Sequence, residues 1–278
     1  MAELQASIEQ AARWVCEAPA ILITAGAGMN VDSDVAELQG RQGAGHGAPM
    51  RGETGGGWHG QEVASPRAFH DQAELAWSVY GCRLHAYRST APHAGFGMLL
   101  KWGQRVPFGC RVFTSNVDGH FQAAGFQPAH VAECHGSLHY FQCAHPLCKS
   151  GAWPADGFQP RCATLDDGRP GTLPRCPLCG YLARPNILLS DDPWWNDGPY
   201  RQTMEHLREW CARQARHLLV IEIGAGQAVP TVRRFGQRHA HRLIRINPCA
   251  AEVPKGARAL GLAASAREAL SRIDALIA

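Results

Sequence analysis

Residues 112–137, VFTSNVDGHFQAAGFQPAHVAECHGS, carry the sequence pattern on which the fold prediction depends most. The stretch starts with a short run of β-forming residues and turns polar at SNVD, which is typical of the place where a strand meets a helix. The carboxyl ends of strands face the ligand crevice in an open α/β sheet, so we expect Asn116 and Asp118 to point into it. After a segment long enough to form one helix, His135 is followed by Gly136. A glycine lets another backbone segment approach the chain closely at this point. We therefore predict a site in two pieces at this sheet edge.

Two further apolar runs each end in a Gly-x-Gly turn. AILIT at 20–24 leads into GAG at 26–28, and HLLVIEI at 217–223 leads into GAG at 224–226. A strand followed by such a turn presents backbone amides to a phosphate, although one copy is a weak signal because the third glycine of the dinucleotide fingerprint is missing. The alternative is a tight turn without a ligand. The second copy favours a phosphate.

A third apolar run, LIRI at 243–246, ends at Asn247. Three such runs predict a parallel sheet with a nucleotide across its carboxyl edge. Apolar residues at helical spacing over 68–89 and 264–277 predict helices around it. The expected fold class is α/β, a Rossmann-like parallel sheet with helices on both faces, plus a small zinc-binding module and a helical and loop insertion.

Composition limits the classes of partner. The chain has 278 residues, of which 45% are hydrophobic, so it can bury a sizeable core. A formal net charge of +3 is too mild to indicate a specific nucleic-acid partner. The longest apolar run is too short to span a membrane, and the first twenty residues lack the features of a signal peptide. We expect a cytoplasmic protein without a membrane partner.

Glycine is nearly every second residue over 40–60, GRQGAGHGAPMRGETGGGWHG. No stable helix or strand is expected there. Long loops of this kind inside a domain are often lids over a binding site. We predict a lid that becomes ordered on a cofactor, and the alternative is a plain flexible surface loop.

The eleven cysteines point to metal ligands or reduced thiols rather than disulfides. Cys143 and Cys148 form one close-spaced pair, and Cys176 and Cys179 form another. A small irregular module without its own hydrophobic core needs a cross-link to be stable, and a zinc ion held by four thiolates provides one. We predict a structural zinc, since four thiolates leave no open position for water. Four unrelated buried cysteines are the alternative, and Cys162 is a rival for the fourth ligand position.

Taken in order, these motifs resemble the sirtuin family of NAD-dependent protein deacylases, as a divergent bacterial-type member. The resemblance extends from about Ala20 to the last helix. The two cysteine pairs belong to it, together with GAGMNVDSDVAELQG at 26–40, PHAGF at 92–96, TSNVDGHFQAAG at 114–125, HGS at 135–137, RPNILLSDD at 184–192, GAGQAVP at 224–230 and IN at 246–247.

The resemblance implies an enzyme that consumes NAD. The acyl oxygen of an acylated lysine, carried by a protein or peptide substrate, would attack the ribose carbon as nicotinamide leaves. The acyl group would end on ADP-ribose. The resemblance also implies a division of the chain: residues 1–137 and 184–278 would form the NAD-binding domain, with a lid loop and helical insertion at 41–90, and residues 138–183 would form a zinc-ribbon-like module.

The residues implied to bind NAD follow the predicted strands: Gly26, Ala27, Gly28, Leu38, Gln39, Ser115, Asn116, Asp118, Gly224, Ala225, Gly226 and Asn247. The first glycine turn would hold the pyrophosphate and the second would lie along the adenosine. Asn247 would bind the adenine ribose, while Asn116 and Asp118 would line the nicotinamide and its ribose.

His135 is implied to be the general base. Imidazole titrates near neutrality, so it can take a proton from a ribose hydroxyl at working pH. Asn116 and Asp118 complete the implied catalytic group. The alternative for His135 is a structural histidine that caps a turn. His93, in PHAGF, is expected to brace a loop rather than to take part in the chemistry.

The chain departs from the family pattern at several positions. An aromatic residue becomes Leu38 and an arginine becomes Gln39, and the loss of a charged contact should weaken the positioning of NAD. Asn30 and Asp34 stand where serine and glycine are usual. The substrate strand reads Ser190-Asp191-Asp192 in place of a phenylalanine, a glycine and an acidic residue. A glycine there would allow close approach of a substrate backbone.

These departures leave two alternatives to a deacylase. A different nucleophile at the ribose carbon would give an NAD glycohydrolase or an ADP-ribosyl transferase. A chain that has kept the fold and lost efficient use of NAD would be a catalytically weakened NAD-binding module.

Overall fold

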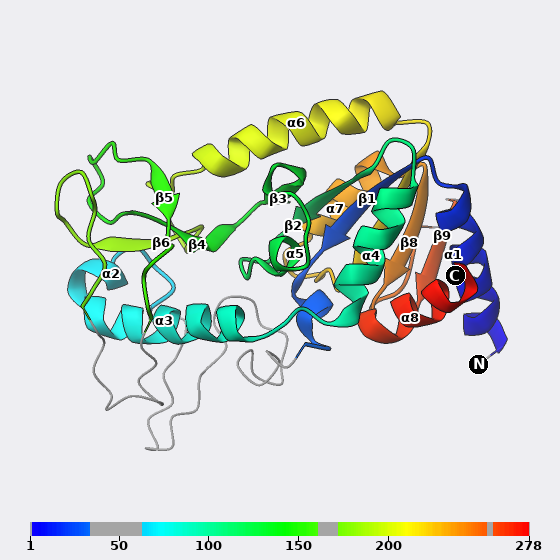
Figure 1. Cartoon of the computed structure of the whole chain (residues 1–278), viewed down its shortest axis with the longest axis horizontal. Helices are drawn as coiled ribbons and strands as arrows, with labels where there is room; N and C mark the ends of the chain where they lie inside the picture. Colours follow the sequence, from blue (N-terminus) through cyan, green and yellow to red (C-terminus); the bar gives the residue numbers. More distant parts are fainter. Residues whose placement is uncertain (1, 34–62, 161–171, 255–257, 278) are drawn as a thin grey trace, which may run out of the picture.

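Six parallel strands form the main sheet, in the order β3-β2-β1-β7-β8-β9 (Figure 1). The computed structural model describes residues 2–33, 63–160, 172–254 and 258–277. The strands are β1 (Ala20–Ala25), β2 (Cys110–Thr114), β3 (Val131–Glu133), β7 (Leu218–Ile223), β8 (Arg242–Ile246) and β9 (Ala259–Leu262). The three apolar runs noted in the sequence are β1, β7 and β8, and they are neighbours in the sheet as expected.

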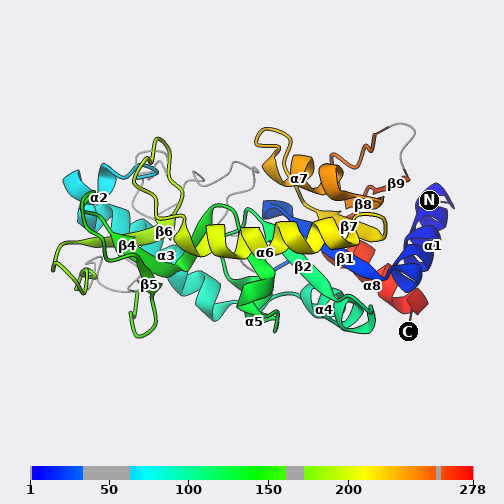
Figure 2. The ribbon, with the colours of Figure 1, turned by 90° about the horizontal axis from the view of Figure 1, so that it is seen from above.

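Helices cover both faces of this sheet (Figure 2). One face carries α1 (Ala2–Glu17), α4 (Ala94–Arg105) and α8 (Ala266–Ile277), and the other carries α6 (Gly198–Gln214) and α7 (Thr231–His239). Successive side chains of a strand point to opposite faces. Ile21 and Ile23 therefore share a core with Leu270 of α8, whereas Leu22 packs with Leu207 of α6. Burial on both faces explains why these strands are largely apolar. The buried charged exceptions, Glu222 of β7 and Arg245 of β8, form an ion pair with each other.

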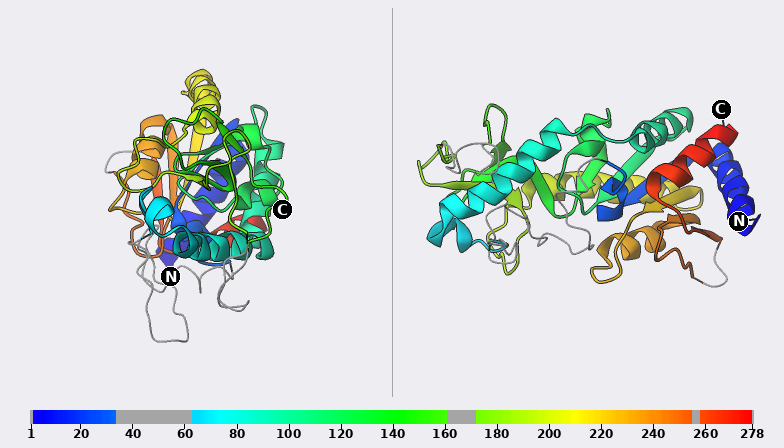
Figure 3. Two further views of the ribbon diagram at one scale, coloured as in Figure 1. Left: turned by 90° about the vertical axis from the view of Figure 1, so that its left-hand side faces the viewer. Right: turned by 90° about the horizontal axis from the view of Figure 1, so that it is seen from below.

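The ends of the chain meet at one end of the molecule. Helices α1 and α8 lie side by side there, beside β9 and away from the second sheet (Figure 3). Residues Ile8, Ala11 and Val15 of α1 are buried in the same core as Ile273 of α8. None of the helices within the described ranges combines the length and the hydrophobicity that crossing a bilayer requires.

The second sheet is small and antiparallel. It contains β4 (Gly136–Cys143) between β5 (Ala152–Pro154) and β6 (Ala183–Ile187). Helices α2 (Ala68–Asp71) and α3 (Ala73–Ser89) pack against it. The ring of Trp77 in α3 packs edge-on against that of Phe141 in β4, with the ring centroids 5.1 Å apart. Helix α6 runs along the molecule from this sheet to the parallel one (Figure 1).

The predicted helix over 68–89 is divided in two. Gln72, with φ −143° and ψ 49°, separates α2 from α3. In the described part of the chain, short elements in connections include η1 (Ala27–Asn30), α5 (His120–Ala123) and η3 (Pro128–His130). The predicted lid over 40–60 lies outside the described residues.

The strand order reverses at β1. From β1 the chain first reaches β2 on one side and later β7 on the other. In open α/β sheets such a reversal opens a crevice at the carboxyl ends of the strands, and ligands bind there. The residues that follow β1, β2 and β7 therefore come together at one edge.

Candidate active site

The segment after β2 is fastened to the end of β1. The Ser115 amide donates to the Ala25 carbonyl at 3.1 Å. The Thr114 hydroxyl donates to the same carbonyl at 2.9 Å and accepts the Asn116 amide at 3.0 Å. Asn116 is 8% exposed, and its side-chain Nδ2 has no hydrogen-bond partner within the described part of the chain. A buried donor without a partner is a point at which a bound molecule would be recognised.

Asp118 is held at three points. Its Oδ1 accepts the backbone amide of His120 at 2.8 Å, and its Oδ2 accepts Nδ2 of Asn30. Nε2 of His139 donates to the backbone carbonyl of Asp118 at 2.8 Å. Gly119 has φ +73°, and a Cβ there would lie 2.7 Å from the His139 ring. The carboxylate is therefore fixed in place by its neighbours.

His135 lies beside the same segment. Its ring makes a hydrogen bond to the backbone of Ser115, and its carbonyl accepts the Leu188 amide at 2.9 Å. Burial lowers the pKa of His135, while the bond to Ser115 acts in the opposite direction. Gly136 has φ +77°, and a Cβ on it would come within 2.1 Å of the Asn186 carbonyl oxygen, so the backbones meet closely as expected. Asn116, Asp118 and His135 are thus brought to one sheet edge.

Glu133, at the end of β3, adds a further carboxyl group to this region. Burial raises its pKa to about 8, and the neighbouring Asp118 adds to that shift. Hydrogen bonds to Ser137 and Gln122 act in the opposite direction. A carboxyl group with this pKa is largely protonated at neutral pH.

The two Gly-x-Gly turns pack against each other. The Gly26 amide donates to the Ile223 carbonyl and the Gly28 amide to the Gly224 carbonyl, both at 3.0 Å. These two amides are therefore engaged within the protein, and the glycines permit the contact between the turns. A role for Gly26, Ala27 and Gly28 at a pyrophosphate stays a prediction.

Asn247 joins the end of β8 to the second turn. Its Oδ1 accepts the amides of Cys249 and Ala250, each at 3.0 Å, and its Nδ2 donates to the Ala225 carbonyl at 3.3 Å. Nε of Arg233 also donates to that carbonyl, at 3.0 Å. A Cβ on Gly226 would meet open space. Contacts of these residues with an adenosine stay predictions.

The three predicted substrate-strand residues follow β6 and differ in their surroundings. The Ser190 amide donates to the Ala64 carbonyl at 2.9 Å. Asp191 has φ +50°, a conformation that favours glycine. Asp192 forms a buried ion pair with Arg184 at 2.8 Å, so its side chain faces inward. Their roles toward a substrate stay predictions, as do those of Asp34, Leu38 and Gln39, which lie outside the described residues.

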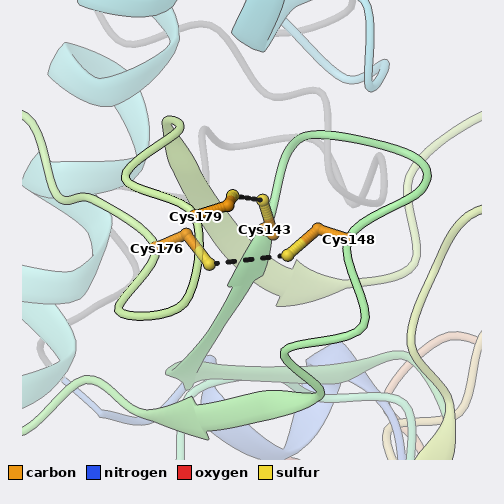
Figure 4. Close-up of side chains that lie close together, drawn as sticks. All are labelled: Cys143, Cys148, Cys176 and Cys179. Carbon is orange, nitrogen blue, oxygen red and sulfur yellow. Dashed lines mark hydrogen bonds between the residues drawn. The ribbon is translucent and has the colours of Figure 1, made fainter.

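The four predicted cysteine ligands converge (Figure 4). The sulfur atoms of Cys143, Cys148, Cys176 and Cys179 all lie within 4.8 Å of one another. Sγ of Cys143 is 3.6 Å from Sγ of Cys179, and Sγ of Cys148 is 3.7 Å from Sγ of Cys176. Zn–S bonds of about 2.3 Å in a tetrahedron place sulfur atoms roughly 3.8 Å apart, so the cluster fits a structural zinc.

Among the other cysteines that the structure describes, all but one follow the expectation of free thiols. Cys16, Cys110, Cys134, Cys211 and Cys249 are free. Cys82 is disulfide-bonded, so the expectation that thiols would stay reduced is wrong at this position. The rival ligand Cys162 lies outside the described residues.

Sequence reasoning missed two histidines next to Asp118. The backbone amide of His120 donates to the Asp118 carboxylate, and the His139 ring donates to the Asp118 carbonyl. His120 lies within the polar segment that follows β2, whereas no sequence signal pointed to His139. His93 braces the turn after β1, as predicted: its Nε2 donates to the Met29 carbonyl at 2.8 Å. Its Nδ1 accepts the Gly95 amide, which caps α4.

Comparison with known proteins identifies the family. The sequence pattern described as the Sir2 family matches residues 51–229, more than half of the chain. This chain belongs to the Sir2 family. The members of this family are also called sirtuins. The predicted resemblance is therefore confirmed.

Curated relatives of this Sir2 protein are distant. It is 26% identical over 236 residues to "NAD-dependent protein deacylase 1" of Pseudomonas aeruginosa, covering 82% of each chain. It is 28% identical over 198 residues to an "NAD-dependent protein deacylase" of Thermococcus sibiricus, covering 67% of this chain and 66% of that one. It is 26% identical to a "Probable bifunctional ADP-ribose hydrolase/ADP-ribosyltransferase" of Fusarium oxysporum, covering 83% of this chain but only 39% of that protein.

Solved structures show the same fold. A Sir2 homolog–NAD complex superposes with a TM-score of 0.70 at 20% identity, over 97% of this chain and 93% of that one. A Sir2 protein bound to an acetylated peptide superposes with a TM-score of 0.67 at 17% identity, over 98% and 99%. The expected α/β architecture with a small cysteine-bearing sheet is therefore confirmed as a sirtuin fold.

Proposed function

We propose that this Sir2 family protein is an NAD-dependent protein lysine deacylase, which transfers the acyl group to ADP-ribose and releases nicotinamide. The observation that carries the proposal is the convergence of Asn116, Asp118 and His135 at the carboxyl edge of the parallel sheet. Family membership and the deacylase relatives support it.

NAD would be the co-substrate at this edge. The buried Nδ2 of Asn116 is a donor suited to a carbonyl or hydroxyl oxygen of the nicotinamide riboside. An ionised carboxylate has about four acceptor positions, so Asp118 retains capacity beyond its two internal hydrogen bonds. The second glycine turn and Asn247 would lie along the adenosine side.

His135 would act as the general base. Its lowered pKa keeps the imidazole neutral at physiological pH, which is the form that accepts a proton. In the proposed reaction the acyl oxygen of the substrate lysine attacks the ribose carbon and nicotinamide leaves. His135 then takes the proton of a ribose hydroxyl, and that oxygen captures the acyl group. The lysine amine then leaves the acyl carbon, and addition of one water molecule completes the reaction, so the products are free lysine, nicotinamide and O-acyl-ADP-ribose.

The second sheet would support the site without taking part in the chemistry. Zinc held by the four thiolates would be structural, because all four ligand positions are taken by sulfur. We propose that residues 138–183 form this module and that residues 1–137 and 184–278 form the NAD-binding domain, with 41–90 as an insertion. The substrate protein, the predicted cytoplasmic location and the lid stay predictions.

The match to the Fusarium protein favours one second candidate. If water or a protein side chain replaced the acyl oxygen as nucleophile, the same site would act as an NAD glycohydrolase or an ADP-ribosyl transferase. Both candidates release nicotinamide, so they differ in whether release requires an acylated peptide.

Nicotinamide release, measured with and without lysine peptides bearing several acyl groups, tests the proposal. We expect release that depends on the acylated peptide, with O-acyl-ADP-ribose as a product, and loss of release in His135→Ala. His85→Ala is the matched control, because His85 is an exposed histidine on α3. No peptide-dependent release with any acyl group would contradict the deacylase. Conversion of NAD without a peptide would favour the second candidate.

A further inference from the structure

Asn30 connects Asp118 to a histidine that lies deeper in the protein. It stands at the end of η1, while Asp118 and His120 follow β2. Nδ2 of Asn30 donates to Oδ2 of Asp118, and Oδ1 of Asn30 lies 3.1 Å from Nδ1 of His120. All three side chains are buried. The result is a short chain of side chains that starts at a predicted NAD-binding residue.

The chemistry of the three groups sets the direction of each hydrogen bond. A carboxylate oxygen accepts, so the side-chain nitrogen of Asn30 must face Asp118. The oxygen of Asn30 is then left facing His120, and Nδ1 of His120 must donate to it. In the neutral ring this leaves Nε2 without a proton. The contacts therefore select one tautomer of His120.

The ring of His120 is otherwise surrounded by aromatic groups. It meets the rings of Tyr87 and Phe96 edge-on, with centroids 6.1 and 6.0 Å away. Its Nε2 has no hydrogen-bond partner inside the described ranges. Asn30 is therefore the polar anchor that the structure provides for the His120 side chain, and the aromatic rings fix its orientation.

We propose that Asn30 and His120 are positioning residues that hold the Asp118 carboxylate in the orientation needed to bind NAD. His120 fixes the amide of Asn30, and Asn30 fixes one carboxylate oxygen. The His120 backbone amide fixes the other oxygen at 2.8 Å. The remaining acceptor positions of the carboxylate are then aimed at the sheet edge. This inference rests on the proposed function only in assigning Asp118 to NAD.

The tautomer of His120 is the first test, and it needs no turnover. NMR of the imidazole nitrogens in the wild-type protein at pH 8 should show a proton on Nδ1 of His120. In Asn30→Leu the population should shift toward the Nε2–H form, because the acceptor is gone. A wild-type ring protonated on Nε2 would overturn the inference.

The second test is a double-mutant cycle on NAD affinity, measured by calorimetry. Asn30→Leu and His120→Leu should each weaken binding about tenfold, equivalent to about 1.4 kcal/mol. The double variant should be no weaker than either single variant, because both changes break the same chain. His120→Asn keeps a donor near the position of Nδ1 and should restore most of the affinity. Additive losses, or unchanged affinity in both single variants, would overturn the inference.

Two controls separate this role from a general loss of structure. Circular dichroism and thermal unfolding identify variants that fail to fold, and for these Asn30→Ser, which shortens the side chain, replaces Asn30→Leu. With an active enzyme, KM for NAD should rise in the single variants while KM for the peptide stays unchanged. If the wild type binds NAD but shows no turnover, the deacylase proposal fails, and the affinity cycle still decides the positioning role.

Discussion

Gly28 and Gly224 meet backbone to backbone at the reversal of the strand order. The Gly28 amide donates to the Gly224 carbonyl at 3.0 Å, and a Cβ on Gly28 would lie 2.6 Å from the Gly224 Cα. Gly224 itself has φ +58°. The two turns that follow β1 and β7 can approach this closely only because neither residue has a side chain.

Gly28→Ala should therefore destabilise the protein. The clash is with backbone, which cannot rotate away, so we expect a loss of about 1–3 kcal/mol in the free energy of unfolding, measured by urea denaturation. Gly97→Ala is the matched control. Gly97 is exposed in α4 and a Cβ there meets nothing within 4 Å, so alanine should be neutral or stabilise by about 0.5–1 kcal/mol. Equal stability of both variants would contradict the close packing of the turns.

The loss of activity at acidic pH should follow the protonation of His135. Burial lowers the pKa of His135 below the ordinary histidine value of 6.5, and a general base works in its neutral form. The pH profile of kcat/KM should therefore fall on the acid side with a midpoint below 6.5. His135→Ala should lower kcat by about 10²–10⁴-fold. A midpoint above 6.5 would show that another group controls the limb.

Glu133 should make the free energy of unfolding depend on pH at values above the ordinary pKa of a glutamate. The pKa of this carboxyl is raised from 4.5 to about 8 in the folded protein. The folded state therefore holds a proton that the unfolded state releases, so its contribution is complete below pH 4.5 and is lost as the pH rises toward 8. Glu133→Gln, which mimics the protonated form, should lose less stability than the wild type between pH 5 and about pH 8. Parallel stability profiles would contradict this assignment.

Metal analysis should find about one zinc per chain, held by the cysteine cluster. Cys143→Ser should lose the metal and lower the unfolding temperature, since a small module of this kind draws its stability from the metal. Cys249→Ser is the control because Cys249 is an exposed free thiol outside the cluster. A wild-type protein that keeps its unfolding temperature after metal removal would argue against a structural role.

Asp192 should matter more for stability than Asp191. The side chains of Asp192 and Arg184 are 0% and 2% exposed, so Asp192→Ala leaves a buried guanidinium without its partner. We expect a loss of about 3–5 kcal/mol in the free energy of unfolding. Asp191→Gly should be neutral or stabilise by up to about 1 kcal/mol, because glycine accepts φ +50° more readily. The reverse order would indicate that Asp192 is not a structural residue.

Local patterns in the sequence were sufficient for the architecture. Largely apolar runs identified β1, β7 and β8, because parallel strands are buried on both faces. The spacing of the four cysteines identified a metal cluster, because two close pairs supply the ligands of a tetrahedral site. The break at Gln72, which divides α2 from α3, left no clear signal in the helical spacing.

Only the tertiary structure decided which polar groups touch. Asn30 and Asp118 are separated by 88 residues, and the side chain that seemed a mere departure from the family pattern turns out to hold the carboxylate. The inward direction of Asp192 and the contact between the glycine turns were equally hidden. The physical reason is that hydrophobic periodicity is a local property of the chain, whereas a hydrogen bond between distant residues depends on the relative placement of whole strands.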